Sequence, residues 1–185
     1  MLDDAKELAA DGMNTAIERL RRELARIRAG RANPALLDDV KVDSYGSMMP
    51  LKQVGTVSVA DARLLVIKPF DRNNIAAIEK AINNSNLGLN PQSDGVVIRV
   101  PIPPLTEERR KQLVKQAGSA GEDAKIAMRQ VRRDANDMLK QAEKDKEISE
   151  DDLKRGLDQI QKLIDAESKK VDEAVSAKET EILDG

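Results

Sequence analysis

The feature that most constrains this chain is a pair of long helical patterns separated by a segment patterned like strands. Within residues 2–29, apolar side chains recur at spacings of three and four, the period of a coiled-coil-like seam. The same period returns after residue 105 and continues nearly to the end of the chain. Three long helices interrupted once by an insert predict a three-helix bundle whose first connection is replaced by a second domain.

The second helical block contains two features that could interrupt a helix. Gly118 and Gly121 each cost about 1 kcal/mol relative to alanine, but the apolar period passes through them without a phase jump, so we predict a continuous helix. Ser149 and Asp152 resemble a capping box with aspartate in the usual place of glutamate, which predicts the start of the last helix. The apolar stripe expected in the second helix is Leu113, Ala117, Ala120, Ala124, Met128, Val131, Ala135, Met138 and Ala142.

Residues 31–104 have a different character. Residues 56–59 alternate between polar and apolar, which is typical of a half-buried strand, and the apolar run 64–67 predicts a buried strand. Asp71 is placed to cap a short helix, and Asp94 followed by glycine indicates a turn before a last strand. We therefore expect a small α+β domain of the β/α/β type.

The expected fold class is α+β with two domains. The first domain is an elongated antiparallel three-helix bundle made of residues 1–30 and 105–185, and the second is the inserted domain of residues 31–104. The first helix ends where the insert begins, and the second begins where the insert ends, so these two helix ends must be neighbours. Two short linkers between the domains would permit hinge bending.

The composition excludes several classes of function. The chain contains no histidine and no cysteine, which removes the commonest general base, the thiol nucleophile and the usual transition-metal ligands. It also lacks a glycine-rich phosphate loop of the Walker type, a signal-peptide pattern and an apolar run long enough to cross a membrane. We expect a cytoplasmic protein that is not an enzyme, with no cofactor, metal, membrane or small-molecule substrate.

Charge is sorted along the helices. Residues 18–31 carry six arginines and two glutamates, and residues 106–133 carry eight basic and four acidic side chains. The insert is balanced, whereas residues 134–185 carry nine basic and sixteen acidic side chains. A near-neutral chain therefore contains a basic stretch that begins near the linker and continues along the second helix, as expected of a protein that binds a large polyanion.

Most of the basic side chains have a carboxylate within reach on the same helix. The expected pairs are Arg19 with Glu23, Arg21 and Arg22 with Glu18, Arg26 with Glu23, Arg110 with Glu107, Lys125 with Glu122, and Arg133 with Asp137. Four arginines lack such a neighbour: Arg28, Arg31, Arg129 and Arg132. A guanidinium group matches phosphate geometry, so these four are candidate phosphate ligands, although a partner from the third helix remains an alternative.

The polyanion is expected to be folded RNA rather than a single strand read by stacking. Tyr45 and Phe70 are the only aromatic residues, so platforms for stacked bases are almost absent. A rigid helical rod that contacts the phosphates of folded RNA agrees better with this sequence.

Five stretches resemble, in order and along the whole chain, the ribosome recycling factor family. They are residues 27–34 (IRAGRANP), 87–91 (LGLNP), 99–110 (RVPIPPLTEERR), 131–136 (VRRDAN) and 145–152 (DKEISEDD). The resemblance implies an L-shaped translation factor that, with elongation factor G and GTP, disassembles the post-termination 70S ribosome into subunits and releases it from mRNA. It also implies a monomer with a tRNA-like outline.

The resemblance also implies which residues serve this function. Contacts with large-subunit rRNA are expected at Arg28, Arg31, Arg110, Arg129 and Arg132, to which we add the neighbouring Arg133. The hinge is expected at Gly30, Arg31, Ala32, Asn33, Pro103, Pro104 and Leu105. The alternatives are a coiled-coil scaffold that dimerises through its heptads, an RNA-binding adaptor without a recycling role, and a carboxylate-only hydrolase, which nothing beyond abundant aspartate and glutamate supports.

Overall fold

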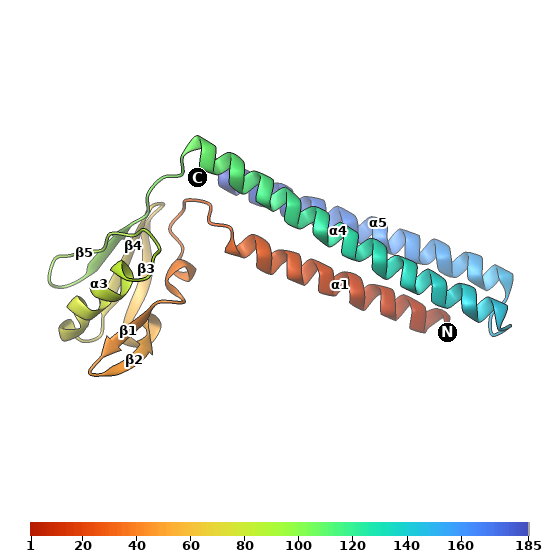
Figure 1. Ribbon diagram of the computed structural model, residues 1–185, viewed down its shortest axis with the longest axis horizontal. Coiled ribbons are helices and arrows are strands. Elements are labelled where there is room, and N and C mark those ends of the chain that lie inside the picture. Colours follow the sequence, from red (N-terminus) through yellow and green to blue (C-terminus); the bar gives the residue numbers. More distant parts are fainter. Residues whose placement is uncertain (185) are drawn as a thin grey trace. The chain divides into compact units, whose positions relative to one another are not determined.

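The computed structural model describes residues 1–184, in which the chain forms two units (Figure 1). Unit 1 consists of residues 1–29 and 107–184, and unit 2 of residues 30–106. The chain leaves unit 1 once and returns to it, as expected for an inserted domain. No helix within the described residues has an apolar stretch of the length and composition that spanning a membrane requires.

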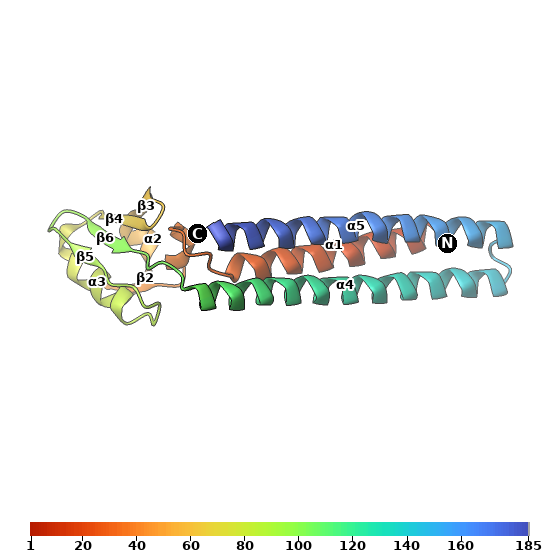
Figure 2. The ribbon, with the colours of Figure 1, turned by 90° about the horizontal axis from the view of Figure 1, so that it is seen from above.

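Unit 1 is a bundle of three long helices, α1 (Leu2–Arg26), α4 (Glu107–Lys144) and α5 (Glu150–Asp184), which lie side by side in both ribbon views (Figures 1 and 2). Each helix contacts the other two. The glycine at position 156, near the start of α5, lies beside Leu139 near the end of α4 and Leu2 at the start of α1. The second helix therefore runs antiparallel to the first and third, which confirms the predicted antiparallel bundle.

Each helix has a glycine that packs directly against a side chain of a neighbouring helix. A Cβ atom on Gly12 of α1 would lie 2.7 Å from Val131 Cγ1 on α4, and one on Gly121 of α4 would lie 2.6 Å from Val175 Cγ2 on α5. Gly156 of α5 completes the set. The helix α4 is continuous through Gly118 and Gly121, which confirms the prediction, and the structure adds that Gly121 is a packing contact.

The stripe predicted for α4 is partly wrong. Ala120, Val131 and Met138 are only half-buried, and Gly121 and Leu139 occupy buried places instead. The physical reason is that α4 packs against two helices, so its buried face is centred between them rather than on a single seam. The remaining predicted positions are confirmed as buried: Leu113, Ala117, Ala124, Met128, Ala135 and Ala142.

The turn between α4 and α5 is stabilised by local hydrogen bonds. The backbone N–H of Asp152 donates to Ser149 Oγ at 3.0 Å, and the N–H of Ser149 donates to Asp152 Oδ2 at 3.3 Å, which confirms the predicted capping box. The hydrogen bonds with Ser149 hold the pKa of Asp152 below its usual range, and the charge of Arg155 contributes further. The third helix therefore begins where the sequence predicts.

Unit 2 is a small α+β domain, as predicted. Its elements are β1 (Lys41–Ser44), β2 (Ser47–Pro50), α2 (Leu51–Val54), β3 (Gly55–Asp61), β4 (Leu64–Pro69), α3 (Ile75–Asn83), β5 (Gln92–Ser93), β6 (Ile98–Pro101) and two single-turn 3₁₀ helices, Pro34–Leu37 and Arg72–Asn74. Strands β1 and β2 form a hairpin, and the other four form an antiparallel sheet in the order β3-β4-β6-β5.

The core of unit 2 lies between the sheet and α3. Leu65 and Ile67 of β4 and Ile98 of β6 are fully buried and join Ile78 and Ile82 of α3 in one apolar cluster. Alternate residues of β4 are only half-buried, so this strand is buried on one face rather than on both. The alternation of residues 56–59 predicted a strand with one buried face, but residues 58–61 of β3 are exposed. We attribute this exposure to the position of β3 at the edge of the sheet.

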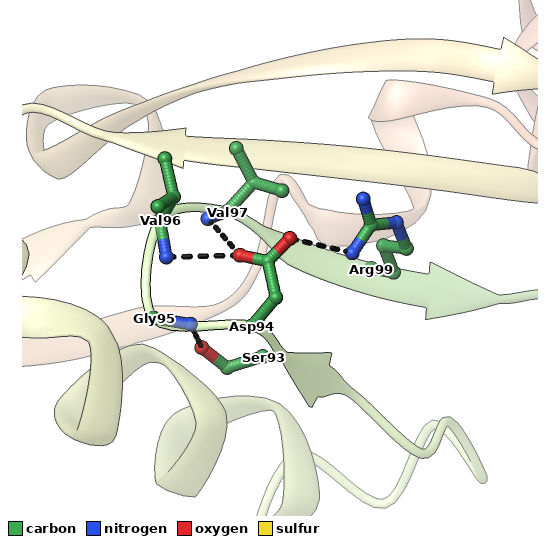
Figure 3. Close-up of polar contacts among 6 residues, drawn as sticks. All are labelled: Ser93, Asp94, Gly95, Val96, Val97 and Arg99. Atoms are coloured by element: carbon green, nitrogen blue, oxygen red, sulfur yellow. Dashed lines mark hydrogen bonds and ion pairs between the residues drawn. The ribbon is translucent and has the colours of Figure 1, made fainter.

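The turn before β6 is stabilised by a single carboxylate (Figure 3). The backbone N–H groups of Val97 and Val96 both donate to Asp94 Oδ1 at 2.9 Å, and Arg99 Nη1 donates to Asp94 Oδ2 at 2.8 Å. The two backbone donors and then the guanidinium hold the pKa of Asp94 far below its usual range. Gly95 has a φ of +88°, as the predicted turn requires.

Candidate nucleic-acid interface

The six arginines predicted as an interface lie on three segments of the chain. Arg28 follows the end of α1, and Arg31 belongs to the first residues of unit 2. Arg110 lies in the first turn of α4, and Arg132 and Arg133 follow Arg129 about two-thirds of the way along that helix. Four of the six therefore lie on α4.

The basic residues in the middle of α4 follow one helical stripe. Lys125, Arg129 and Arg132 are spaced by four and then three residues, so they project from one face of a helix with 3.6 residues per turn. This stripe lies beside α5, because Lys125 and Arg132 both contact side chains of that helix. A linear polyanion could therefore meet several cations along a single rigid face.

Two of these cations have carboxylate partners that the sequence did not predict. Lys125 Nζ lies 2.6 Å from Asp172 Oδ1 on α5, not beside Glu122 as predicted. Glu122 is thereby left to Arg129, whose Nη2 lies 2.8 Å from Glu122 Oε1. The prediction that Arg129 has no carboxylate partner is therefore wrong. The partner lies two helical turns away, about 10 Å along the axis, beyond the spacing of three or four residues on which the prediction depended.

Arg132 is held by a neutral group. Its Nη1 donates to Gln161 Oε1 on α5 at 3.1 Å, and no described carboxylate forms an ion pair with it. Gln161 Nε2 in turn donates to Asp165 Oδ1 at 2.9 Å. The alternative of a partner from the third helix is thus correct for Arg132, but that partner leaves the charge of Arg132 uncompensated.

The other four arginines have no ion-pair partner among residues 1–184. Arg28, Arg31 and Arg133 are exposed, so the predicted pair between Arg133 and Asp137 does not form. Arg110 is half-buried, and its Nε is buried without a hydrogen-bond partner. Glu107, the predicted partner of Arg110, pairs instead with Lys111, whose Nζ lies 3.3 Å from Glu107 Oε1. These side chains retain donors that an external anion could engage.

The structure leaves further arginines unpaired that the sequence analysis had assigned to ion pairs. Three arginines of α1 form no ion pair within the described residues, although each has a glutamate at helical spacing: Arg21, Arg22 and Arg26. By contrast, the predicted pair of Arg19 with Glu23 forms, at 3.1 Å. Arg26 lies in the last turn of α1, where a positive charge complements the helix dipole. It lines an open groove between α1 and α4. The groove also contains Ile27 and residues from the start of α4, which confirms that these helix ends are neighbours.

The predicted hinge residues differ in how firmly unit 2 holds them. Gly30 has a φ of +74°, and a Cβ on it would lie 2.9 Å from Leu105 Cγ, so the outgoing and returning segments touch there. The N–H of Ala32 donates to the carbonyl oxygen of Ala62 at 2.7 Å, and Asn33 caps the first 3₁₀ helix. Ala32 and Asn33 are therefore both hydrogen-bonded to other residues of unit 2.

The returning segment is held in a similar way. The N–H of Ile102 donates to the carbonyl oxygen of Arg63 at 2.8 Å. Arg63 follows Ala62, whose carbonyl oxygen accepts from the N–H of Ala32. The two prolines that follow are exposed and lie outside regular secondary structure. The turn between β3 and β4 therefore anchors both segments.

Comparison with known proteins gives a consistent result. The sequence profile described as ribosome recycling factor matches residues 20–183. The chain is 54% identical over 183 residues to the ribosome-recycling factor of Carboxydothermus hydrogenoformans, with 99% of each chain covered. It is 52% identical over 184 residues to that of Halalkalibacterium halodurans, covering 100% of this chain and 97% of the relative.

Solved structures agree with the sequence comparison. A solution structure of a ribosome recycling factor matches with a TM-score of 0.75 and 43% identity, covering 100% of this chain and 98% of the other. A second match is the T. thermophilus ribosome recycling factor, described with E. coli elongation factor G on the E. coli post-termination complex; its TM-score is 0.64 at 44% identity, and 99% of each chain is covered. The chain belongs to the ribosome recycling factor family.

Proposed function

We propose that this protein is a translation factor that acts with elongation factor G and GTP to split the post-termination ribosome into subunits and release it from mRNA. Membership of the family supports this, as does the structural match to a recycling factor described on a post-termination complex. Nucleotide hydrolysis belongs to elongation factor G, because this sequence has no phosphate-binding loop of the Walker type. The protein itself acts without catalysis, in the cytoplasm, as a monomer.

The observation that carries the proposal is the set of guanidinium groups left without a carboxylate in unit 1. Arg28, Arg110, Arg132 and Arg133 each retain an uncompensated charge within the described residues. Such groups bind phosphate strongly because both charge and donor geometry match. We infer that they bind the phosphates of large-subunit rRNA and that unit 1 is the anchor. Arg129 joins the interface only when its exposed ion pair opens, which costs at most about 1 kcal/mol.

We infer that unit 2 moves on the two connecting segments while unit 1 stays bound. The hydrogen bonds of Ala32 and Ile102 restrict this motion to Gly30 and Arg31 on one side and to Pro103, Pro104 and Leu105 on the other. Ala32 and Asn33, also predicted as hinge residues, would then move with unit 2. Elongation factor G would supply the force that rotates unit 2 against intersubunit contacts.

The dimerising scaffold is the alternative that the bundle argues against. The apolar seam that would mediate dimerisation is buried between α1, α4 and α5 of one chain. Sedimentation equilibrium separates the two proposals, because the recycling factor should sediment with the mass of one 20.4 kDa chain. A concentration-dependent dimer mass would favour the scaffold.

The interface is tested with Arg132→Gln, which removes one guanidinium but keeps a side chain suited to a helix. We expect weaker co-sedimentation with ribosomes, slower subunit splitting with elongation factor G and GTP, and an unchanged helical circular dichroism spectrum. The matched control is Arg19→Gln, which removes the same charge from an exposed, ion-paired arginine outside the candidate interface. If both variants split ribosomes equally well, the proposed interface is wrong.

A further inference from the structure

Three neighbouring cations on α4 have three different kinds of partner. Lys125 is paired with a carboxylate of α5, and Arg129 with a carboxylate of its own helix. Arg132, one helical turn beyond Arg129, is held instead by the side-chain amide of Gln161. Among these cations, only Arg132 is both held in place by α5 and left with its full charge. The amide at position 161 makes this difference.

The orientation of that amide is set by a second residue. A glutamine side chain has a donor end and an acceptor end, and which end faces the arginine depends on its other contact. Asp165, one turn along α5, has only acceptors when ionised, so it takes the amide nitrogen of Gln161 at 2.9 Å. The amide oxygen is then turned toward Arg132, whose nitrogens are all donors, and receives Nη1 at 3.1 Å.

This arrangement leaves most of the arginine available. A guanidinium group has five N–H donors, and the hydrogen bond to Gln161 uses one nitrogen, Nη1. The remaining edge can still form two parallel hydrogen bonds to a phosphate. A carboxylate at position 161 would compete with the phosphate for the same charge, whereas a neutral amide orders the side chain without neutralising it.

We propose that Gln161 is a positioning residue, which holds Arg132 in the orientation that binds phosphate while leaving its charge uncompensated, and that Asp165 sets the orientation of the amide. The proposal rests on the proposed function for its biological meaning, because it assumes that Arg132 binds rRNA phosphate. The contact between the two side chains can be tested in the free protein without that assumption.

The first test is the mobility of the Arg132 side chain in the free protein. The heteronuclear NOE of its Nε–H group measures this mobility and does not involve the ribosome. We expect an ordered guanidinium in the wild type and in Gln159→Leu, an exposed control on the same helix, and a mobile one in Gln161→Leu. Asp165→Asn should give an intermediate value, because asparagine can accept from or donate to the amide. An equally mobile Arg132 in wild type and Gln161→Leu would overturn the proposal.

The second test is the salt dependence of ribosome binding by Gln161→Glu. We expect the new carboxylate to pair with Arg132, so that the log–log slope becomes shallower by up to about 0.9, the effect of one lost phosphate contact. Between 50 and 200 mM salt this corresponds to about a threefold smaller loss of affinity. Gln159→Glu adds the same charge to α5 at a site without this contact and serves as the control. Equal slopes for the two glutamate variants would overturn the proposal.

The two proposals fail in different ways. If Arg132→Gln binds ribosomes like the wild type, the rRNA interface is wrong, whatever the NMR measurements show. If Arg132→Gln binds weakly but Gln161→Glu behaves like Gln159→Glu, the interface stands and the role of Gln161 is wrong. In the Arg132→Gln background, Gln161→Glu should change the slope no more than Gln159→Glu does, because the side chain that it would neutralise is absent.

Discussion

The two glycines of α4 should respond differently to the same substitution. Alanine is favoured over glycine in a helix by about 1 kcal/mol at either position. At Gly118 nothing lies within 4 Å of the added Cβ, so the whole gain should appear as stability. At Gly121 the Cβ would lie 2.6 Å from Val175 Cγ2, roughly 1 Å inside the optimal carbon–carbon separation.

The magnitude at Gly121 follows from two opposing terms. Valine has one strongly preferred rotamer in a helix, so Val175 cannot swing away freely and the helices must separate locally. Such overpacking costs about 1–3 kcal/mol, against the gain of about 1 kcal/mol from helix propensity. We therefore expect Gly121→Ala to be neutral or to destabilise unit 1 by up to about 2 kcal/mol, and the two variants to differ by about 1–3 kcal/mol.

Urea and thermal unfolding followed by circular dichroism at 222 nm measure this difference, because most helical residues belong to unit 1. For a chain of this size, each kcal/mol shifts the melting temperature by about 2–4 °C. Gly118→Ala should melt above the wild type, and Gly121→Ala at or below it. In the double variant Gly121→Ala/Val175→Ala the methyl group that clashes with the added Cβ, Val175 Cγ2, is absent, so a double-mutant cycle should give a favourable coupling energy. If both single substitutions stabilise the protein equally, the close approach of α4 and α5 at this point is wrong.

Three further predictions concern a turn, a cap and a charge. Asp94→Asn should destabilise unit 2 at pH 7 but less so in acid. The depressed pKa of Asp94 contributes stability above about pH 4, its usual pKa region, and this stability is lost as the pH falls toward the pKa of the folded state. Hydrogen exchange of the β6 amides at pH 7 and pH 3 measures the change in stability. Ser149→Ala should destabilise unit 1 by about 0.5–2 kcal/mol in urea unfolding, because the N–H of Asp152 loses its acceptor. Glu122→Gln should release Arg129 and make ribosome binding steeper in salt by up to about 0.9 in log–log slope; an unchanged slope would indicate that Arg129 does not meet phosphate.

Caps, turns and helix periodicity are what the sequence predicted well, whereas of the predicted ion pairs within one helix only that of Arg19 with Glu23 forms among the described residues. The capping box at Ser149, the turn at Asp94 and the apolar period of the three helices each depend on residues within a few positions of one another. The unbroken helix through Gly118 was also predictable, because a change of helix phase would have been visible in the spacing of the apolar residues. The extent of the resemblance to the family likewise required nothing beyond the residues themselves.

Partner choice between helices could not be predicted in this way. Lys125 pairs with Asp172 of α5, so Glu122 is available to pair with Arg129. Which of these pairs forms depends on the register of α5 against α4. That register is set by side-chain packing, including the close contact at Gly121, and not by any spacing along one helix. A search limited to neighbouring turns therefore gave Lys125 the wrong carboxylate and left Arg129 without one.

Local propensity, periodicity and composition were enough to predict the elements of this protein, their order and the stretches that carry positive charge. Which of those charges remain available depends on contacts between helices. Arg132 meets Gln161 across the bundle, 29 residues away along the chain, and receives a neutral partner where a carboxylate would have neutralised it. Whether a cation is paired depends on which side chains the packing of three helices brings within about 3 Å, a distance that no one-dimensional pattern encodes.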